Sequence, residues 1–116
     1  MNVNSAMNGE HVVALREDEL VLVRTILERN GVGASNAPVI FGSRATGRAR
    51  RYSDLDIGFA GEPVSADHLA RIEAELEESE LPLRVDVLNL EHASQGLRTH
   101  ALSDAVPLEL AIGRAA

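Results

Sequence analysis

The sequence contains no cysteine, no lysine and no tryptophan, and only 3% of its residues are aromatic. Without cysteine, the chain cannot form disulfides, zinc knuckles, iron–sulfur sites or a thiol nucleophile. Without lysine, it lacks a phosphate-loop lysine, a Schiff-base lysine and a lysine general base. All 11 basic residues are therefore arginines.

The sequence also has no long apolar run, and its charge is predominantly negative. No stretch approaches the roughly 20 apolar residues of a membrane span, and the first residues do not resemble a secretory signal. We therefore expect a cytoplasmic protein that does not bind membranes. The 18 acidic residues outnumber the 11 basic ones, which gives a net charge of −7. This acidity argues against direct nucleic-acid binding, because phosphates would be repelled.

The chain of 116 residues has the length and composition of one globular domain. Residues 1–10 are polar and rich in asparagine, which predicts a flexible tail. We expect the domain to span residues 11–116. The role of the short apolar segment 11–15 stays open, because it is compatible with a strand, a helix start or a docking segment.

Hydrophobic spacing predicts alternating helices and strands. Acidic residues at 17–19 and an Asn30-Gly31 stop bound the first helix, and Ser65 is a candidate N-cap for the second. Pro107 restricts the last strand to a sheet edge or an irregular tail. The expected elements are a helix over 17–30, strands over 38–41 and 55–59, a helix after Ser65, a strand over 83–90, a helix over 92–102 and an edge strand or irregular tail over 106–112.

Connection lengths predict how the strands pair. Residues 42–53 are too few for a parallel crossover, so strands 38–41 and 55–59 should be antiparallel. Residues 61–81 are enough for a helical crossover between parallel strands. The sequence thus predicts an α/β (α+β) fold with a small mixed sheet and helices packed on one face.

Three acidic residues and a Gly-Ser pair stand out as candidates for chemistry. Gly42 and Ser43 directly follow an apolar strand, where glycine lets a phosphate approach the backbone. Asp54 and Asp56 are two residues apart on a strand, so both side chains project from one face. Asp86 lies on the polar face of another strand. Each feature alone is most often a turn or a solvated strand face, and only their conjunction favours a site.

If the three carboxylates converge, they need a cation. Two carboxylates ~4 Å apart repel by about 4 kcal/mol at an effective dielectric constant of 20. Oxygen ligands with open positions suit Mg²⁺ completed by waters and substrate phosphates. A carboxylate beside the metal can accept the proton of an attacking hydroxyl. The pattern therefore favours phosphoryl or nucleotidyl transfer.

The segment Gly42-Ser43-Arg44-Ala45, followed at the same spacing by Ser53-Asp54-Leu55-Asp56, resembles the minimal nucleotidyltransferase (MNT) family of the DNA polymerase beta superfamily. The strand Val85-Asp86-Val87 resembles the family's third acidic strand. The resemblance covers roughly residues 15–110. The C-terminal part departs from the family, because it lacks the common Glu-Gly and aromatic residue before the last strand.

The resemblance implies a nucleotidyltransferase fold and a Mg²⁺-dependent reaction with ATP as substrate. It assigns Asp54 and Asp56 to two Mg²⁺ ions, and Asp86 to completing the metal site and helping to deprotonate the acceptor. Gly42 and Ser43 would hold the triphosphate while an acceptor hydroxyl attacks the α-phosphorus and pyrophosphate leaves.

Four arginines lie between the two halves of the motif. We expect Arg44 and Arg51 to bind nucleotide phosphates. The alternative is that the arginines of this segment only offset the nearby carboxylates.

The resemblance also implies a partner. Small members of the family accompany an all-helical HEPN ribonuclease toxin, which they bind and adenylylate on a tyrosine. The leading hypothesis is therefore the antitoxin of a HEPN/MNT toxin–antitoxin pair, with the wide apolar helix 17–30 and the C-terminal tail as candidate docking surfaces. A binding-only antitoxin and an adenylyltransferase for a small-molecule hydroxyl are the alternatives.

Overall fold

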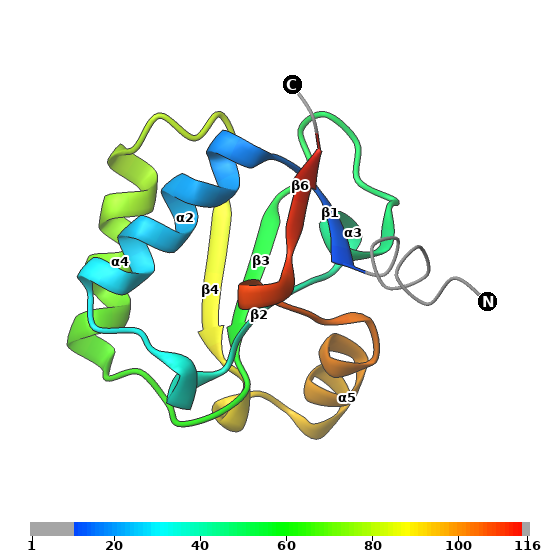
Figure 1. The fold of residues 1–116 in the computed structure, drawn as a ribbon. Coiled ribbons are helices and arrows are strands. Elements are labelled where there is room, and N and C mark those ends of the chain that lie inside the picture. Colours follow the sequence, from blue (N-terminus) through cyan, green and yellow to red (C-terminus); the bar gives the residue numbers. More distant parts are fainter. Residues whose placement is uncertain (1–10, 115–116) are drawn as a thin grey trace.

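A four-stranded mixed sheet forms the centre of the computed structural model, which describes residues 11–114 (Figure 1). The predicted tail, residues 1–10, lies outside the described residues. The helices are α2 (Glu17–Arg29), α3 (Ser43–Thr46), α4 (Ala66–Glu78) and α5 (Gln95–Asp104). The strands are β1 (Val12–Arg16), β2 (Pro38–Phe41), β3 (Leu55–Phe59), β4 (Val85–Asn89), β5 (Val106–Pro107) and β6 (Ile112–Arg114).

The strand pairing follows the predicted connection lengths. The sheet order is β4–β3–β2–β5, with β2 antiparallel to both β3 and β5. Strand β4 runs parallel to β3 and is reached through α4. The predicted antiparallel and parallel pairs are both confirmed, and with them the α/β class.

Helices α2 and α4 cover one face of the sheet. Their buried residues, such as Leu20 and Ile72, share a core with the inward-facing Leu55, Ile57 and Phe59 of β3. Each helix begins with a recognisable signal, because α2 carries three acidic residues in its first turn and the Ser65 hydroxyl accepts a hydrogen bond from the His68 N–H. No helix among the described residues is long and apolar enough to cross a membrane.

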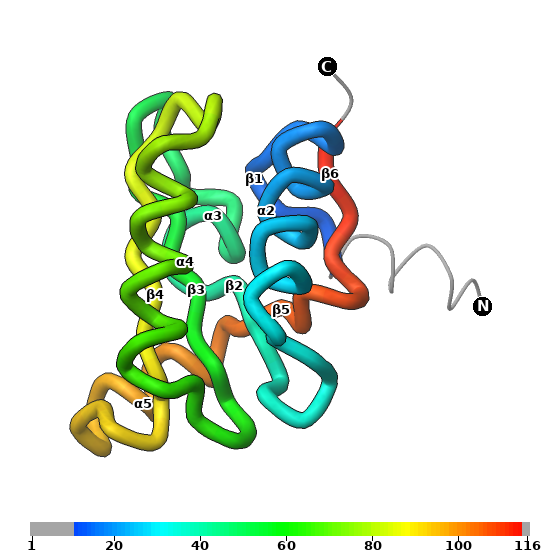
Figure 2. The backbone as a smooth tube through the Cα atoms, turned by 90° about the vertical axis from the view of Figure 1, so that its left-hand side faces the viewer, coloured from blue at the N-terminus to red at the C-terminus, as the bar shows by residue number. Residues whose placement is uncertain are grey.

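Helix α5 packs on the opposite face of the sheet. A second core joins its Ala101 to Val39, Phe41 and Leu90, and Figure 2 shows α5 on the other side of the sheet from α2. The expectation of helices on one face therefore holds for α2 and α4, and α5 extends the arrangement. The cause is the alternation of the strands, because Val39 and Phe41 present a second apolar face that also needs covering.

Strands β1 and β6 form a separate parallel pair beside α2 (Figure 2). This pair settles the open segment 11–15 as a strand. Residues 106–112, for which the sequence left an edge strand or an irregular tail open, combine both: the chain forms the short edge strand β5, a 3₁₀ turn over Leu108–Leu110 and then β6. Pro107 has no N–H to donate, so it ends the ladder that β5 makes with the edge of β2.

The wide apolar surface of helix 17–30 is explained mainly by packing within the chain. The sheet and α4 bury one side of α2, and β1 and β6 lie against another. Residues that stay exposed are fewer: Val12, Val21, Leu110 and Ile112 are 38–52% exposed. The candidate docking surface is therefore smaller than the whole helix and consists of these few side chains around β1, β6 and α2.

Candidate functional site

The structure places the three candidate acids on or directly beside neighbouring strands. Asp56 of β3 and Asp86 of β4 are paired in register, and because the strands are parallel their side chains project to the same side. Asp54 directly precedes β3, close enough for its charge to act on the Asp56 carboxyl. Leu55 and Ile57 on either side of Asp56 belong to the core under α2 and α4, so Asp56 and Asp86 lie on the opposite sheet face. Figure 1 shows β3 and β4 side by side.

Gly42 brings the Gly-Ser pair directly against these acids. It ends β2 at φ +75° and ψ −156°, a conformation that is essentially restricted to glycine. A Cβ atom built there would lie 2.4 Å from the Asp56 Oδ2 atom. Only a residue without a side chain can therefore occupy this position while Asp56 keeps its place, and Ser43 follows at the first position of α3.

The acids make one another's charges unfavourable. The pKa of the Asp56 carboxyl is raised from its ordinary value, first because the group is partly buried and then because Asp86 and Asp54 repel its charged form. Asp86 has a partial counter-charge, since its Oδ1 atom lies 3.5 Å from the Arg84 Nε atom. The site therefore gains stability from any cation that binds between these carboxylates.

The donor set fits Mg²⁺ completed by a phosphate ligand. Across residues 11–114, no three His, Cys, Asp or Glu side chains are arranged as a ready-made metal cage. Mg²⁺ does not need such a cage, because it binds through one or two carboxylates, waters and substrate phosphates. Asp54, Asp56 and Asp86 supply hard oxygen donors, and Gly42, which has no side chain, brings the backbone that precedes Ser43 directly beside the Asp56 carboxylate.

Arg44 is held inside the fold. Only 7% of it is exposed, and its guanidinium donates to backbone carbonyls of Ala14, Arg51 and Ser53. These bonds tie the segment before Asp54 to β1. Arg44 thus holds the loop rather than presenting a free guanidinium to a nucleotide, because burial and three carbonyl partners fix its side chain.

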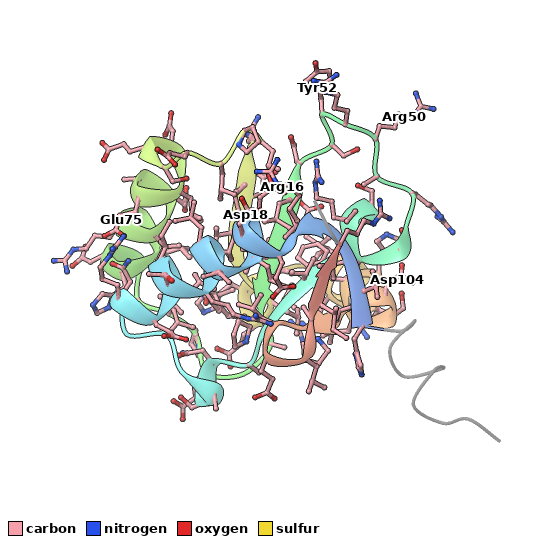
Figure 3. All side chains as sticks on the ribbon, turned by 45° about the horizontal axis from the view of Figure 1, so that its top comes forward. Arg16, Asp18, Arg50, Tyr52, Glu75 and Asp104 are labelled. Carbon is pink, nitrogen blue, oxygen red and sulfur yellow. The ribbon has the colours of Figure 1, made fainter. Side chains whose placement is uncertain are left out.

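Arg51 is exposed, and its guanidinium carbon lies 5.5 Å above the centre of the Tyr52 ring. Tyr52 itself is 79% exposed. Figure 3 shows Tyr52 and Arg50 on a loop that projects from the domain. Arg51 therefore keeps a guanidinium available to an anion, whereas Arg44 does not.

A largely apolar hollow lies away from the acids. A cavity of about 350 Å³ is lined mostly by apolar residues, among them Leu27, Val32, Val39 and Leu108. It opens near the start of β2, whereas the Gly-Ser pair follows the end of that strand. The chemistry of the residues, and not cavity size, therefore locates the candidate site.

Arg84 is a site residue that sequence reasoning missed. It lies two residues before Asp86 and contacts that carboxylate. The signal was available, because residues two apart on a strand share a face. An Arg-x-Asp pair on the predicted strand 83–90 therefore indicated an arginine beside the third acid.

Comparison with known families identifies the domain. Residues 22–108 match the family described as "Polymerase beta, Nucleotidyltransferase". The chain belongs to this nucleotidyltransferase family. The match spans all three acids and the Gly-Ser pair, so the family resemblance seen in the sequence is confirmed.

Individual relatives agree with the family assignment. The nucleotidyltransferase domain is 37% identical over 86 residues to "Probable protein adenylyltransferase MntA" of Haemophilus influenzae, which covers 72% of this chain and 73% of that protein. A solved minimal nucleotidyltransferase is 32% identical, with a TM-score of 0.61 over 78% of this chain and 89% of the other.

More distant structures share the fold. A toxin–antitoxin structure with AMP-PNP has a TM-score of 0.62 at 22% identity, over 79% of this chain and 72% of that one. A complex of tri-AMPylated HEPN toxin with MNT antitoxin from Shewanella oneidensis has a TM-score of 0.59 at 18% identity, over 79% and 70%. At these identities the likeness is one of fold.

Proposed function

We propose that this nucleotidyltransferase is a Mg²⁺-dependent adenylyltransferase that acts as the antitoxin of a HEPN/MNT pair. It would transfer AMP from ATP to a tyrosine hydroxyl of the partner ribonuclease. The observation that carries the proposal is the contact between Gly42 and Asp56, with Asp86 paired in register beside Asp56 and the Asp54 charge acting on it. Carboxylates beside a glycine–serine turn form a site for a metal-bound nucleotide.

The proposed roles divide between metal and phosphate. Asp54, Asp56 and Asp86 would hold Mg²⁺, which when bound neutralises phosphate charge and polarises the α-phosphorus. Gly42 lets the triphosphate approach the backbone, and the Ser43 hydroxyl and N–H are available to donate to it. Arg51 is an additional donor for the phosphates.

The proposed transfer is a displacement at the α-phosphorus. The oxygen of the acceptor hydroxyl forms a bond to that phosphorus, and the bond to the bridging oxygen of pyrophosphate breaks. The hydroxyl proton passes to a carboxylate of the site, for which we favour Asp86. Its Arg84 neighbour orients this carboxylate, because the two groups are 3.5 Å apart.

The partner is proposed from the relatives. The curated relative carries the name of a protein adenylyltransferase, and structures with the same fold include antitoxins in complex with HEPN toxins. The exposed apolar residues Val12, Val21 and Ile112 offer a contact surface for such a partner.

Label transfer tests the proposal directly. The full chain, its candidate HEPN ribonuclease partner, Mg²⁺ and ATP labelled in the α-phosphate should yield labelled ribonuclease and released pyrophosphate. Replacing the partner's tyrosines with phenylalanine should abolish labelling if tyrosine is the acceptor.

The double variant Asp54→Ala, Asp56→Ala should neither label nor neutralise the ribonuclease. The control Asp104→Asn, which changes an exposed acid at the end of α5, should do both. Full neutralisation by the double variant would instead establish a binding-only antitoxin.

A further inference from the structure

Five of the chain's 11 arginines gather around one hollow that contains none of the three candidate acids. The hollow has a volume of about 280 Å³ and lies between β1, β6 and the loop before Asp54. Its charged lining consists of Arg16, Arg44, Arg50, Arg51, Arg114 and a single acid, Glu19. In a chain with net charge −7, such a concentration of positive charge requires an explanation.

Two of these arginines are direct neighbours across a strand pair. Arg16 of β1 and Arg114 of β6 are paired in register, so the parallel strands place two positive side chains next to each other. Like charges in that relation destabilise a strand pair unless an anion lies between them.

The nearby acids do not neutralise the cluster. Glu19 accepts a hydrogen bond from the Arg16 backbone N–H at 2.9 Å, and Glu17 accepts one from the Gly113 N–H at 2.8 Å. Asp18 pairs with Arg16 at 3.0 Å (Figure 3). Within residues 11–114, Arg16 is the member of the cluster that has an ion pair, and Arg44 is held by backbone carbonyls. Arg50, Arg51 and Arg114 keep their guanidiniums available to a ligand.

We propose that this arginine pocket binds a compact polyphosphate anion, such as pyrophosphate or the phosphate chain of a nucleotide. Arginine donates paired N–H groups that match phosphate oxygens, and several arginines can share the charge of linked phosphates. The hollow is large enough for two or three phosphate groups. A long nucleic acid fits less well, because the acidic remainder of the surface repels an extended polyanion.

The pocket is joined to the catalytic segment by Arg44. This buried side chain lines the hollow and donates to the carbonyls of Arg51 and Ser53, the latter directly before Asp54. An anion that binds Arg51 and Arg114 would therefore order the loop that ends at Asp54. Binding should slow amide hydrogen exchange in residues 48–53.

Calorimetry of the full chain with pyrophosphate, in EDTA and at low salt, tests the proposal. Removing divalent metal suppresses binding at the acids, so the arginine pocket is measured alone. We expect wild-type protein to bind pyrophosphate, and Arg16→Gln with Arg114→Gln to bind at least about tenfold more weakly. The control Arg71→Gln, an exposed arginine of α4, should bind like wild type. Circular dichroism and thermal melting establish that each variant is folded.

A variant of the acids separates this site from the catalytic one. Asp54→Asn with Asp56→Asn should bind pyrophosphate at least as well as wild type in EDTA. Failure of wild-type protein to bind, equal binding by the double arginine variant, or loss of binding in the acid variant would overturn the proposal. A single-stranded RNA oligomer that displaces pyrophosphate at lower concentration would point to nucleic acid instead. The assay contains neither ATP nor a partner protein, so its outcome is independent of the proposed transfer reaction.

Discussion

One segment, residues 42–54, joins two regions of opposite charge. At one region, Asp56 of the inner strand β3 and Asp86 of the edge strand β4 are held side by side by strand register. At the other, Arg16 and Arg114 are paired at the ends of two short strands outside the sheet. Both regions collect like charges that repel, and each thereby favours a ligand of the opposite sign. Side chains of like charge that the fold holds close together can therefore mark a binding site.

The regions differ in how firmly they are built. The acids stand on strands whose neighbouring residues, Leu55, Ile57 and Val87, are buried in the main core. The arginine pocket relies on β1, β6 and one loop, held by the bonds of Arg44. Substitutions at the acids should therefore affect chemistry with little structural loss, whereas substitutions near the arginines should affect loop order first.

The largest expected effect is on chemistry at the acidic region. Asp56→Asn removes a metal-binding oxygen charge and should lower adenylyl transfer by about 10²–10⁴-fold. Labelled AMP transfer at saturating ATP and Mg²⁺ measures this loss. The control Asp104→Asn, on the exposed end of α5, should keep wild-type rates. A loss of less than tenfold in Asp56→Asn would remove Asp56 from the catalytic group.

The next effect concerns the contact between the Gly-Ser pair and the acids. Gly42→Ala adds a Cβ atom 2.4 Å from the Asp56 Oδ2 atom and forces alanine into a glycine-only conformation. We expect a destabilisation of about 2–4 kcal/mol in urea unfolding and loss of transfer activity.

Gly47→Ala is the matched control for that substitution. Gly47 also has a positive φ of +81°, but a Cβ atom there meets no atom within 4 Å. It should cost only about 1 kcal/mol, with activity retained. Equal costs at the two glycines would show that backbone strain alone, and not crowding at Asp56, explains the requirement for Gly42.

The third effect tests the link between the regions. Arg44→Gln removes the donors to the carbonyls of Ala14, Arg51 and Ser53, and at least the buried Ala14 carbonyl loses its partner. We expect a loss of about 2–3 kcal/mol in unfolding free energy and faster amide exchange in residues 48–53. Arg48→Gln, on the same loop but exposed, should change stability by less than about 0.5 kcal/mol. Unchanged amide hydrogen exchange in residues 48–53 of Arg44→Gln would show that Arg44 does not link the two regions.

The acidic region was predictable from the sequence because its geometry is local. Residues two apart on a strand share a face, so Asp54 and Asp56 had to lie together. The length of the α4 crossover then predicted a parallel neighbour, on which Asp86 occupies the polar face. Short-range periodicity and one connection length were sufficient to assemble the acids.

The arginine region was not predictable, because it depends on contacts between distant parts of the chain. Nothing local in segment 11–15 indicates that it pairs with 112–114, and Pro107 obscured the pattern of the C-terminal strand. By residue type, Arg44 is a candidate phosphate ligand. Its carbonyl partner Ala14, however, lies on β1, whose position depends on the pairing of β1 with β6. Long-range pairing of short strands, and not residue type, decided the role of Arg44.

The smallest expected effect is a pH dependence that comes from the acids alone. Burial and the charges of Asp86 and Asp54 raise the pKa of Asp56 in the folded protein above its value in the unfolded chain. The stability that the protonated Asp56 carboxyl contributes is therefore complete below the unfolded pKa and is lost as pH rises through the folded pKa.

In EDTA at pH 7, Asp56→Asn should melt a few degrees above wild type, because it removes a repelled charge. That advantage should shrink as pH falls through the folded-state pKa of Asp56, because the wild-type carboxyl then takes up a proton. Thermal melting of both proteins across this range measures the difference, and added Mg²⁺ should raise the melting temperature of wild type more than that of the variant. An advantage that grows as pH falls would mean that the Asp56 carboxylate is stabilised, and not repelled, by its neighbours.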